Sequence, residues 1–277
     1  GIAAVSFVGS TPIARYIYET GARHGKRVQA LGGAKNHMVV MPDADPEQVT
    51  DALIGAAYGS AGERCMAISV AVPVGEKTAD ALMERLVPRV EGLKIGLSTD
   101  VEADFGPLVT REALGRVRDY VEVGVKEGAD LVVDGRGFQM QGYEDGFFMG
   151  GCLFDKVTPN MRIWQEEIFG PVLSVLRVRT PEEAFRINNE VDYGLSSSVY
   201  TSDVRAAFRA MNELDNGITY INAPTIGAEA HLPFGGVKQT GNGHREGGWE
   251  VFEFYTETKV IYVDYSGKLQ RAQIDNY

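Results

Sequence analysis

The sequence predicts an α/β fold in which a mostly parallel sheet carries helices on both faces. Short apolar stretches alternate with helix-like stretches along most of the chain, and strands joined through helices usually run parallel. The 277 residues are 44% hydrophobic, which is enough apolar material to fill a core of this kind.

The first elements make a single βαβ unit. Residues 3–8 are expected to form a buried strand, residues 9–12 a turn into a helix with proline near its first position, and residues 27–31 a second strand. A dinucleotide-binding sheet of the Rossmann type contains two βαβαβ halves, so one unit cannot complete it. Residues 1–33 are therefore expected to be the end of a dinucleotide-binding domain.

After this unit the alternation becomes regular. Residues 38–41 are expected to form a short strand, and Asp45 can cap a helix that has Pro46 at its first position. Residues 59–62 contain two glycines that break this helix. Cys65 then follows at a junction between elements, where a side chain can face a cleft.

The rest of the chain continues in the same way until the tail. Apolar residues recur at helical spacing in some segments and fill short runs in others. Strands are expected over 67–74, 131–133, 172–178, 196–200 and 218–222, and helices over 79–90, 111–126, 181–189 and 204–214. Residues 259–265 stand apart as a late strand, which we expect to add to a sheet edge, in this chain or in a neighbouring subunit.

The composition indicates a soluble protein that acts on a small molecule. Its 38 acidic and 27 basic residues give a net charge of −11 without a basic cluster, which disfavours nucleic acid and anionic membranes as partners. No apolar stretch approaches the roughly 20 residues of a membrane helix, and the first residues lack the layout of a signal peptide. We therefore expect a cytoplasmic location.

The two cysteines, Cys65 and Cys152, are expected to be reduced thiols because two distant cysteines make no disulfide framework. Cys152 precedes an apolar stretch and is interpreted as a small buried hydrophobe. The four histidines, among them His37 and His231, are scattered and have no ligand spacing with Cys65. No metal site is expected.

Six motifs follow one another in an order that resembles the aldehyde dehydrogenase superfamily. A glycine pair after a strand is by itself more often a plain turn, so the order carries the resemblance. The motifs are Phe-Val-Gly-Ser-Thr at 7–11, Ala-Leu-Gly-Gly at 30–33, Gly-Glu-Arg-Cys at 62–65, Glu-Glu-Ile-Phe-Gly-Pro-Val at 166–172, Asn188 through Tyr-Gly-Leu at 193–195, and Pro-Phe-Gly-Gly-Val-Lys at 233–238. The resemblance implies a catalytic domain over 34–248, a C-terminal segment with an oligomerisation strand over 249–277, and a homodimer or homotetramer.

The resemblance assigns Cys65 as the catalytic thiol. Its thiolate would add to an aldehyde carbonyl, and the thiohemiacetal would lose hydride to NAD or NADP and become a thioester. This chemistry requires a lowered thiol pKa, and the Cys65 backbone N–H would supply one oxyanion donor.

The resemblance also implies a cofactor site. Glu167 is the expected ribose ligand, since a carboxylate can accept hydrogen bonds from two adjacent hydroxyls. The other cofactor-binding residues that the resemblance implies are Gly9, Ser10, Leu31, Gly32 and Phe169.

Ala30 departs from the pattern of the hydrolytic members, which carry at this position a glutamate that activates the deacylating water. A methyl group cannot accept a proton. This change, with Gly-Ala-Lys-Asn-His at 33–37 and Gly-Glu-Arg-Cys-Met-Ala at 62–67, resembles the methylmalonate-semialdehyde dehydrogenases, which pass the acyl group to coenzyme A. Oxidation of a small semialdehyde with acyl transfer to coenzyme A is therefore favoured over hydrolysis.

Two further residues are candidates for substrate binding. Arg64 could hold a substrate carboxylate with its guanidinium fork, or it could be structural. His231 lies in the loop 225–231, which helps form the substrate entrance and resembles the non-acylating branches of the family. Two alternatives stay open: a non-acylating dehydrogenase that releases the free acid, and a catalytically incomplete fragment or assembly module.

Overall fold

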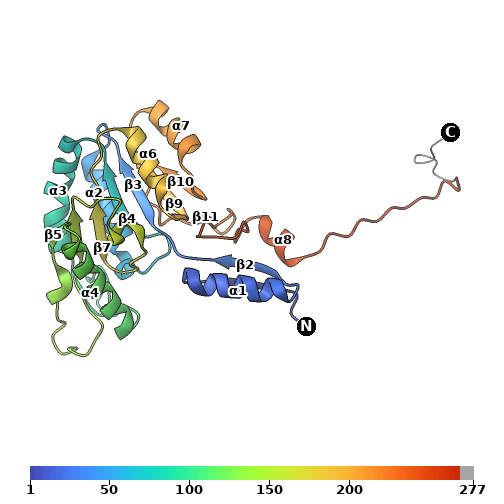
Figure 1. Cartoon of the computed structure of the whole chain (residues 1–277), viewed down its shortest axis with the longest axis horizontal. Coiled ribbons are helices and arrows are strands. Elements are labelled where there is room, and N and C mark those ends of the chain that lie inside the picture. The colour runs from blue at the N-terminus through green and yellow to red at the C-terminus, as the bar shows by residue number, and fades with distance from the viewer. Residues whose placement is uncertain (269–277) are drawn as a thin grey trace.

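A seven-stranded sheet organises the computed structural model, which describes residues 1–268 (Figure 1). Neighbouring strands are parallel except for one antiparallel pair at the edge, between β5 and β6. The mostly parallel sheet predicted from the sequence is confirmed. In order across the sheet, the strands are β10 (Ile218–Ile221), β9 (Ser196–Tyr200), β3 (Asn36–Val40), β4 (Ile68–Pro73), β7 (Val172–Val175), β6 (Cys152–Asp155) and β5 (Asp130–Val133).

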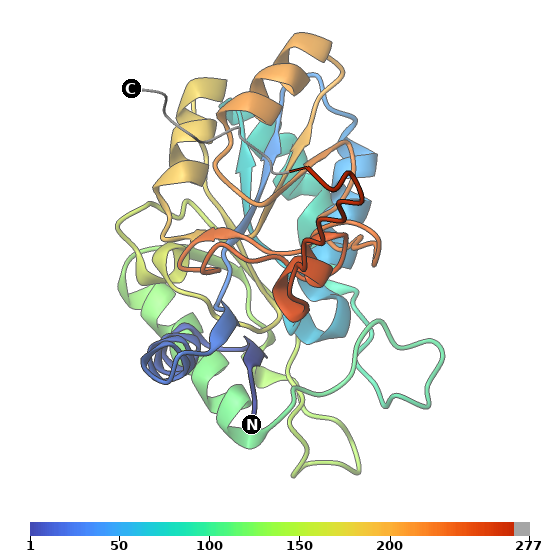
Figure 2. The same cartoon turned by 90° about the vertical axis from the view of Figure 1, so that its right-hand side faces the viewer.

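Helices cover both faces of this sheet (Figure 2). The helices α2 and α3 pack together on one face, and α4 and α6 lie on the other. None of the helices in residues 1–268 is long and apolar enough to cross a membrane. The helices of the main body are α2 (Pro46–Tyr58), α3 (Glu76–Glu91), α4 (Arg111–Lys126), α5 (Arg162–Gln165), α6 (Pro181–Glu190) and α7 (Val204–Glu213).

Local sequence signals account for several helix ends. The Asp45 side chain accepts hydrogen bonds from the backbone N–H groups of Glu47 and Gln48, as the predicted cap requires. Thr110 and Thr180 cap α4 and α6 in the same way. The apolar positions of these helices then face the sheet, so capping and periodicity together fix their orientation.

The βαβ unit predicted at the start of the chain is present as a separate small layer (Figure 1). Strands β1 (Ala4–Val8) and β2 (Arg27–Leu31) pair in parallel, and α1 (Thr11–Arg23) packs on them. Ala14, Val28 and Ala30 form a small core of their own.

The C-terminal part extends away from the main body. After a short antiparallel pair, β8 (Tyr193–Gly194) with β11 (Val237–Lys238), the helix α8 (Glu250–Tyr255) leads into an extended tail that leaves the main body (Figure 1). The expected strand over 259–265 forms no ladder with the described part of this chain, and Tyr262 is 94% exposed. A strand needs a partner edge, and residues 259–265 pair with none within residues 1–268. The rest of the expected C-terminal segment, 269–277, lies outside the described residues.

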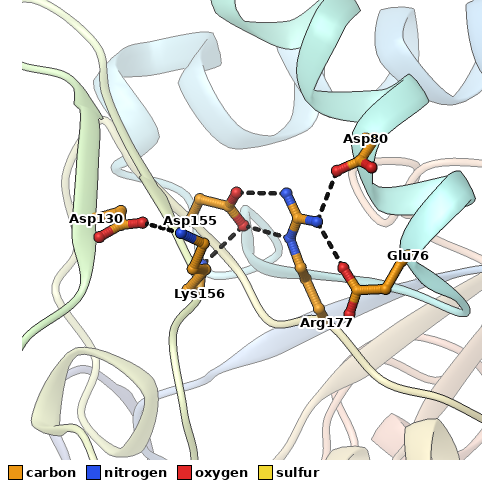
Figure 3. Close-up of polar contacts among 6 residues, drawn as sticks. All are labelled: Glu76, Asp80, Asp130, Asp155, Lys156 and Arg177. Carbon is orange, nitrogen blue, oxygen red and sulfur yellow. Dashed lines mark hydrogen bonds and ion pairs between the residues drawn. The ribbon is translucent and has the colours of Figure 1, made fainter.

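An ion-pair network joins the carboxyl ends of β6 and β7 to α3 (Figure 3). The Arg177 guanidinium donates to both carboxylate oxygens of Asp155, at 3.0 and 2.7 Å, and to Glu76 and Asp80 at 2.8 and 2.7 Å. The side chains of Arg177 and Asp155 are only 16% and 8% exposed. Bidentate pairing with little solvent makes this a strong interaction.

Candidate active site

A cleft forms where the two sheets meet. The loops that follow β1 and β2 face the loops that precede β4 and β7, so carboxyl ends of the small sheet oppose amino ends of the large one. The cleft has a volume of about 350 Å³. It is lined by Val8, Gly9, Ser10, Gly32, Gly33, Cys65, Arg116, Glu167 and Phe169.

Most of the residues singled out from the sequence lie in this cleft. Cys65 shares it with five of the six residues expected to bind a cofactor: Gly9, Ser10, Gly32, Glu167 and Phe169.

The remaining three candidates lie elsewhere. Leu31 is buried, and its carbonyl accepts a hydrogen bond from the Gly9 N–H. The exposed Arg64 donates from Nε to Ser60 Oγ at 2.9 Å and borders a smaller hollow beside Cys65. His231 is exposed in its loop and does not line the cleft.

The loop that carries Cys65 is tightly constrained. Ser60 and Ala61 adopt left-handed backbone conformations, with φ of 54° and 55°, which residues other than glycine seldom do. Gly62 follows with φ of 68°, and a Cβ at this position would overlap the carbonyl oxygen of Gly170. The glycine thus lets the loop that carries Cys65 approach the loop that carries Glu167.

The electrostatics of Cys65 do not favour a thiolate. Partial burial raises the pKa of the thiol, and the carboxylates of Glu167 and Glu246 raise it further. Hydrogen bonding by the backbone N–H groups of Met66 and Cys65 acts in the opposite direction but is weaker. The expected lowering of the thiol pKa is therefore not produced by the described part of the chain.

Glu167 is held against the turn after β2. Its Oε1 accepts a hydrogen bond from the Ala34 N–H at 3.0 Å, and a Cβ on Gly33 would lie 2.5 Å from its Oε2. Burial raises the pKa of this carboxyl, while the Ala34 N–H, Lys35 and Arg116 oppose the rise. One carboxylate oxygen is thus fixed by the backbone, and the other lies where a side chain on Gly33 would project.

Lys35 fixes the backbone around Glu167. Its buried Nζ donates to the carbonyl oxygens of Ile163 and Glu166, each at 2.7 Å. Burial lowers the pKa of Lys35 to about 7. The lysine therefore holds the loop that carries Glu167 to the start of β3.

His37 is part of the same buried support and is neutral. Its Nδ1 lies 2.8 Å from the Lys35 carbonyl, and its Nε2 accepts a hydrogen bond from the Trp164 indole at 3.0 Å. Burial lowers the pKa of His37 to about 3. The Nδ1–H tautomer satisfies both contacts and leaves no ring nitrogen free. In residues 1–268, no three His, Cys, Asp or Glu side chains gather as metal ligands would.

The start of α1 offers a place for an anion. Ser10 is the N-cap residue in an extended conformation, and its side chain makes no capping hydrogen bond. Backbone N–H groups in the first turn of a helix attract phosphate groups. Gly9 and Ser10, which precede this turn, line the cleft together with Cys65.

Arg116 is a cleft residue that the sequence did not single out. It projects from α4, and its positive charge opposes the rise in the pKa of Glu63 and Glu167 that burial causes. The helix carries several arginines, and helical periodicity alone does not tell which of them reaches a cleft formed by distant loops.

Comparison with known proteins gives the family of the chain. The profile of the aldehyde dehydrogenase family matches residues 1–261. The chain belongs to this family. It is 54% identical over 262 residues to a malonate-semialdehyde dehydrogenase of Pseudomonas aeruginosa, covering 94% of this chain and 52% of that protein.

Solved structures of semialdehyde dehydrogenases also resemble the chain. A methylmalonate-semialdehyde dehydrogenase from Sinorhizobium meliloti, crystallised with NAD, superposes with a TM-score of 0.92 at 56% identity, over 93% of this chain and 53% of its own. The methylmalonate-semialdehyde dehydrogenase of Oceanimonas doudoroffii gives 0.90 at 47% identity, over 92% and 52%. The chain therefore spans about half the length of the relatives it matches.

Proposed function

We propose that this chain supplies the catalytic part of an NAD(P)-dependent dehydrogenase that oxidises a small semialdehyde and passes the acyl group to coenzyme A. The observation that carries the proposal is that Cys65 and Glu167 line one cleft with the open N-terminus of α1. A nucleophile, a ribose ligand and a phosphate site are the three parts that such a reaction needs together.

The residues of the cleft fit a dinucleotide. The first turn of α1, behind Gly9 and Ser10, would receive the pyrophosphate, and Glu167 would accept hydrogen bonds from ribose hydroxyls. Phe169 would pack beside the nicotinamide, and the cationic Arg116 would face the negatively charged cofactor. When bound, the oxidised cofactor accepts a hydride, and its pyridinium charge favours the thiolate that the chain alone does not.

Cys65 would carry the covalent steps. Its thiolate forms a C–S bond with the aldehyde carbon, and the resulting oxyanion accepts a hydrogen bond from the Cys65 N–H. Loss of hydride from that carbon gives a thioester. The thiol of coenzyme A then attacks the thioester carbonyl, so the acyl group leaves as its coenzyme A ester and Cys65 regains a free thiol.

The lack of a carboxylate at residue 30 favours a thiol over water as the acyl acceptor. The Ala30 side chain is buried among Ala14 and Val28, and it offers no group that could take a proton from water. The name of the Pseudomonas relative, malonate-semialdehyde dehydrogenase, supports a substrate with a carboxylate. Arg64, next to Cys65, is the residue that we propose for that carboxylate.

The proposed enzyme is a cytoplasmic homodimer or homotetramer. The tail exposes Val260, Ile261, Tyr262 and Val263 to solvent, and an extended apolar segment of this kind would be covered by pairing with another subunit. The competing proposal, a catalytically incomplete module, draws support from the chain's covering only about half of its relatives.

Two measurements on the purified chain test the proposal. Iodoacetamide should label Cys65 at one equivalent, as mass spectrometry of peptides would measure, and NADH fluorescence should change on binding. Cys65→Ser should abolish the labelling and leave the fold intact, while Cys152→Ser should change neither result, because Cys152 is fully buried. If the chain neither reacts at Cys65 nor binds NADH, the incomplete module is the better account.

A further inference from the structure

Buried side chains hold every backbone carbonyl of the segment 65–67, which carries the nucleophile. Asn36 Nδ2 donates to the carbonyl oxygens of Cys65 and Ala67, at 2.9 and 2.8 Å. Thr225 Oγ1 donates to the intervening carbonyl of Met66 at 2.6 Å. Since the two donors lie 29 and 159 residues from their partners, the contacts join three distant parts of the chain at this segment.

Both donors are themselves fixed. Asn36 is 2% exposed, and its Oδ1 accepts hydrogen bonds from the Ser196 N–H at 3.2 Å and the Ser196 hydroxyl at 3.0 Å. All four bonding positions of this amide are thus used, which fixes its orientation. Thr225 is fully buried. The nucleophile segment therefore rests on side chains from the starts of β3 and β9 and from the loop after β10.

These contacts determine where the oxyanion donor points. The peptide plane that contains the Cys65 N–H is fixed at its other end, because the Arg64 carbonyl accepts a hydrogen bond from the Ala67 N–H at 3.0 Å. Asn36 anchors Ala67 through its carbonyl, and it anchors Cys65 in the same way. A small displacement of any of these peptides would turn the Cys65 N–H away from the oxyanion.

We propose that Asn36 and Thr225 are positioning residues that aim the thiol and the N–H of Cys65 at the substrate carbonyl. This inference rests on the proposed function, since it assigns these residues to the same acyl-transfer step. Neither residue lines the cleft of Cys65 and Glu167, and the Asn36 amide, which borders the smaller hollow beside Cys65, has all its bonding positions used within the protein, so both residues act through the backbone of the Cys65 segment.

Two reactions of Cys65 that need no cofactor separate positioning from nucleophilicity. With p-nitrophenyl acetate, the thiolate forms a C–S bond through a tetrahedral oxyanion, and the C–O bond breaks to release nitrophenolate. With iodoacetamide, the C–S bond forms as the C–I bond breaks, and no oxyanion arises. The ratio of the two rates therefore reports oxyanion alignment, while a change in thiol pKa moves both rates together.

Asn36→Ala and Thr225→Val should each lower the ratio of acylation to alkylation by about 10-fold or more, the loss typical of a misaligned oxyanion donor. Thr225→Ser keeps the hydroxyl and should restore the ratio. Hydrogen exchange of the Ala67 amide should be faster in the first two variants and unchanged in Thr225→Ser.

Matched controls lose an equally buried polar group elsewhere. Asn188 bonds to Asn189 and Ser197, and Thr50 donates to a carbonyl within α2, so Asn188→Ala and Thr50→Val should leave the ratio unchanged. An unchanged ratio in Thr225→Val, or an equal fall in the controls, would overturn the inference. If the parent chain is not acylated at all, the proposed function fails, and hydrogen exchange at Ala67 still decides whether the two residues position the segment.

Discussion

Gly62 is the position at which a single methyl group should do the most damage to the site. Gly62→Ala would place a Cβ against the Gly170 carbonyl, at a residue whose φ of 68° already disfavours any side chain. The loop that carries Cys65 and the loop that carries Glu167 would have to move apart by about 1 Å to restore an ordinary van der Waals contact. The change therefore tests directly whether these two loops lie as close as the structure has them.

The expected loss of stability has two sources. A non-glycine residue in the left-handed region costs about 1 kcal/mol, and forced overlap in a packed site costs about 1–3 kcal/mol more. A total of about 3 kcal/mol would lower Tm by about 6–12 °C in a chain of this size. The displacement should also slow acylation of Cys65 by about 100-fold, the usual effect of a misplacement of about 1 Å.

Gly55→Ala is the matched control. A Cβ at Gly55, in the interior of α2, would meet nothing within 4 Å, so this variant should be as stable as the parent or slightly more stable. Urea unfolding, differential scanning calorimetry and the rate of acylation by p-nitrophenyl acetate measure both variants. If Gly62→Ala matches Gly55→Ala in stability and reactivity, the close approach of the two loops is wrong.

Three further predictions concern charge and burial. Burial raises the pKa of Glu167, so the ionised carboxylate lowers the stability of the fold at neutral pH. Glu167→Gln should therefore unfold at a higher urea concentration than the parent at pH 7.5, and the difference should disappear as the pH falls toward 4. The same variant should bind NADH more weakly. Since the pKa of Cys65 is raised, its alkylation rate should climb with pH through a midpoint above the ordinary value of 9.0, and saturating NAD should move that midpoint down; a midpoint below 9.0 without cofactor would show that burial does not control this thiol. Arg177→Met leaves the buried Asp155 with an unpaired charge and should lower the free energy of unfolding by about 3 kcal/mol. Arg209→Met removes only exposed ion pairs and should leave Tm nearly unchanged. Equal Tm values for the two variants would refute this difference.

Local signals in the sequence predicted most of the fold. The bounds of α4 agree with the prediction, and the cap at Asp45 has the expected contacts. The predicted strand over 172–178 is shorter than expected, because β7 ends at Val175 and only single backbone contacts with β4 continue beyond it. Strand β6 was not predicted, because its four residues are all apolar or buried and show no alternation of polar and apolar side chains.

Only the site residues that belong to the ordered motifs could be predicted from the sequence. Ordered motifs brought out Cys65 and Glu167, whereas the support of Cys65 by Asn36 and Thr225 depends on contacts between residues far apart in the chain. The raised pKa of Cys65 is likewise a property of the folded cleft, since burial is its main cause. The expected strand in the tail likewise depends on a partner edge, and residues 1–268 show none paired with it.

We propose above all that coenzyme A resolves a thioester on Cys65. The most direct test joins this chain to the part of its Sinorhizobium meliloti relative that it does not cover, and follows NADH formation from malonate semialdehyde with and without coenzyme A. Without coenzyme A, the fused protein should form one equivalent of NADH per Cys65 and then stop, and with coenzyme A it should turn over steadily and release an acyl coenzyme A product. An equal steady rate without coenzyme A, with release of the free acid, would contradict it.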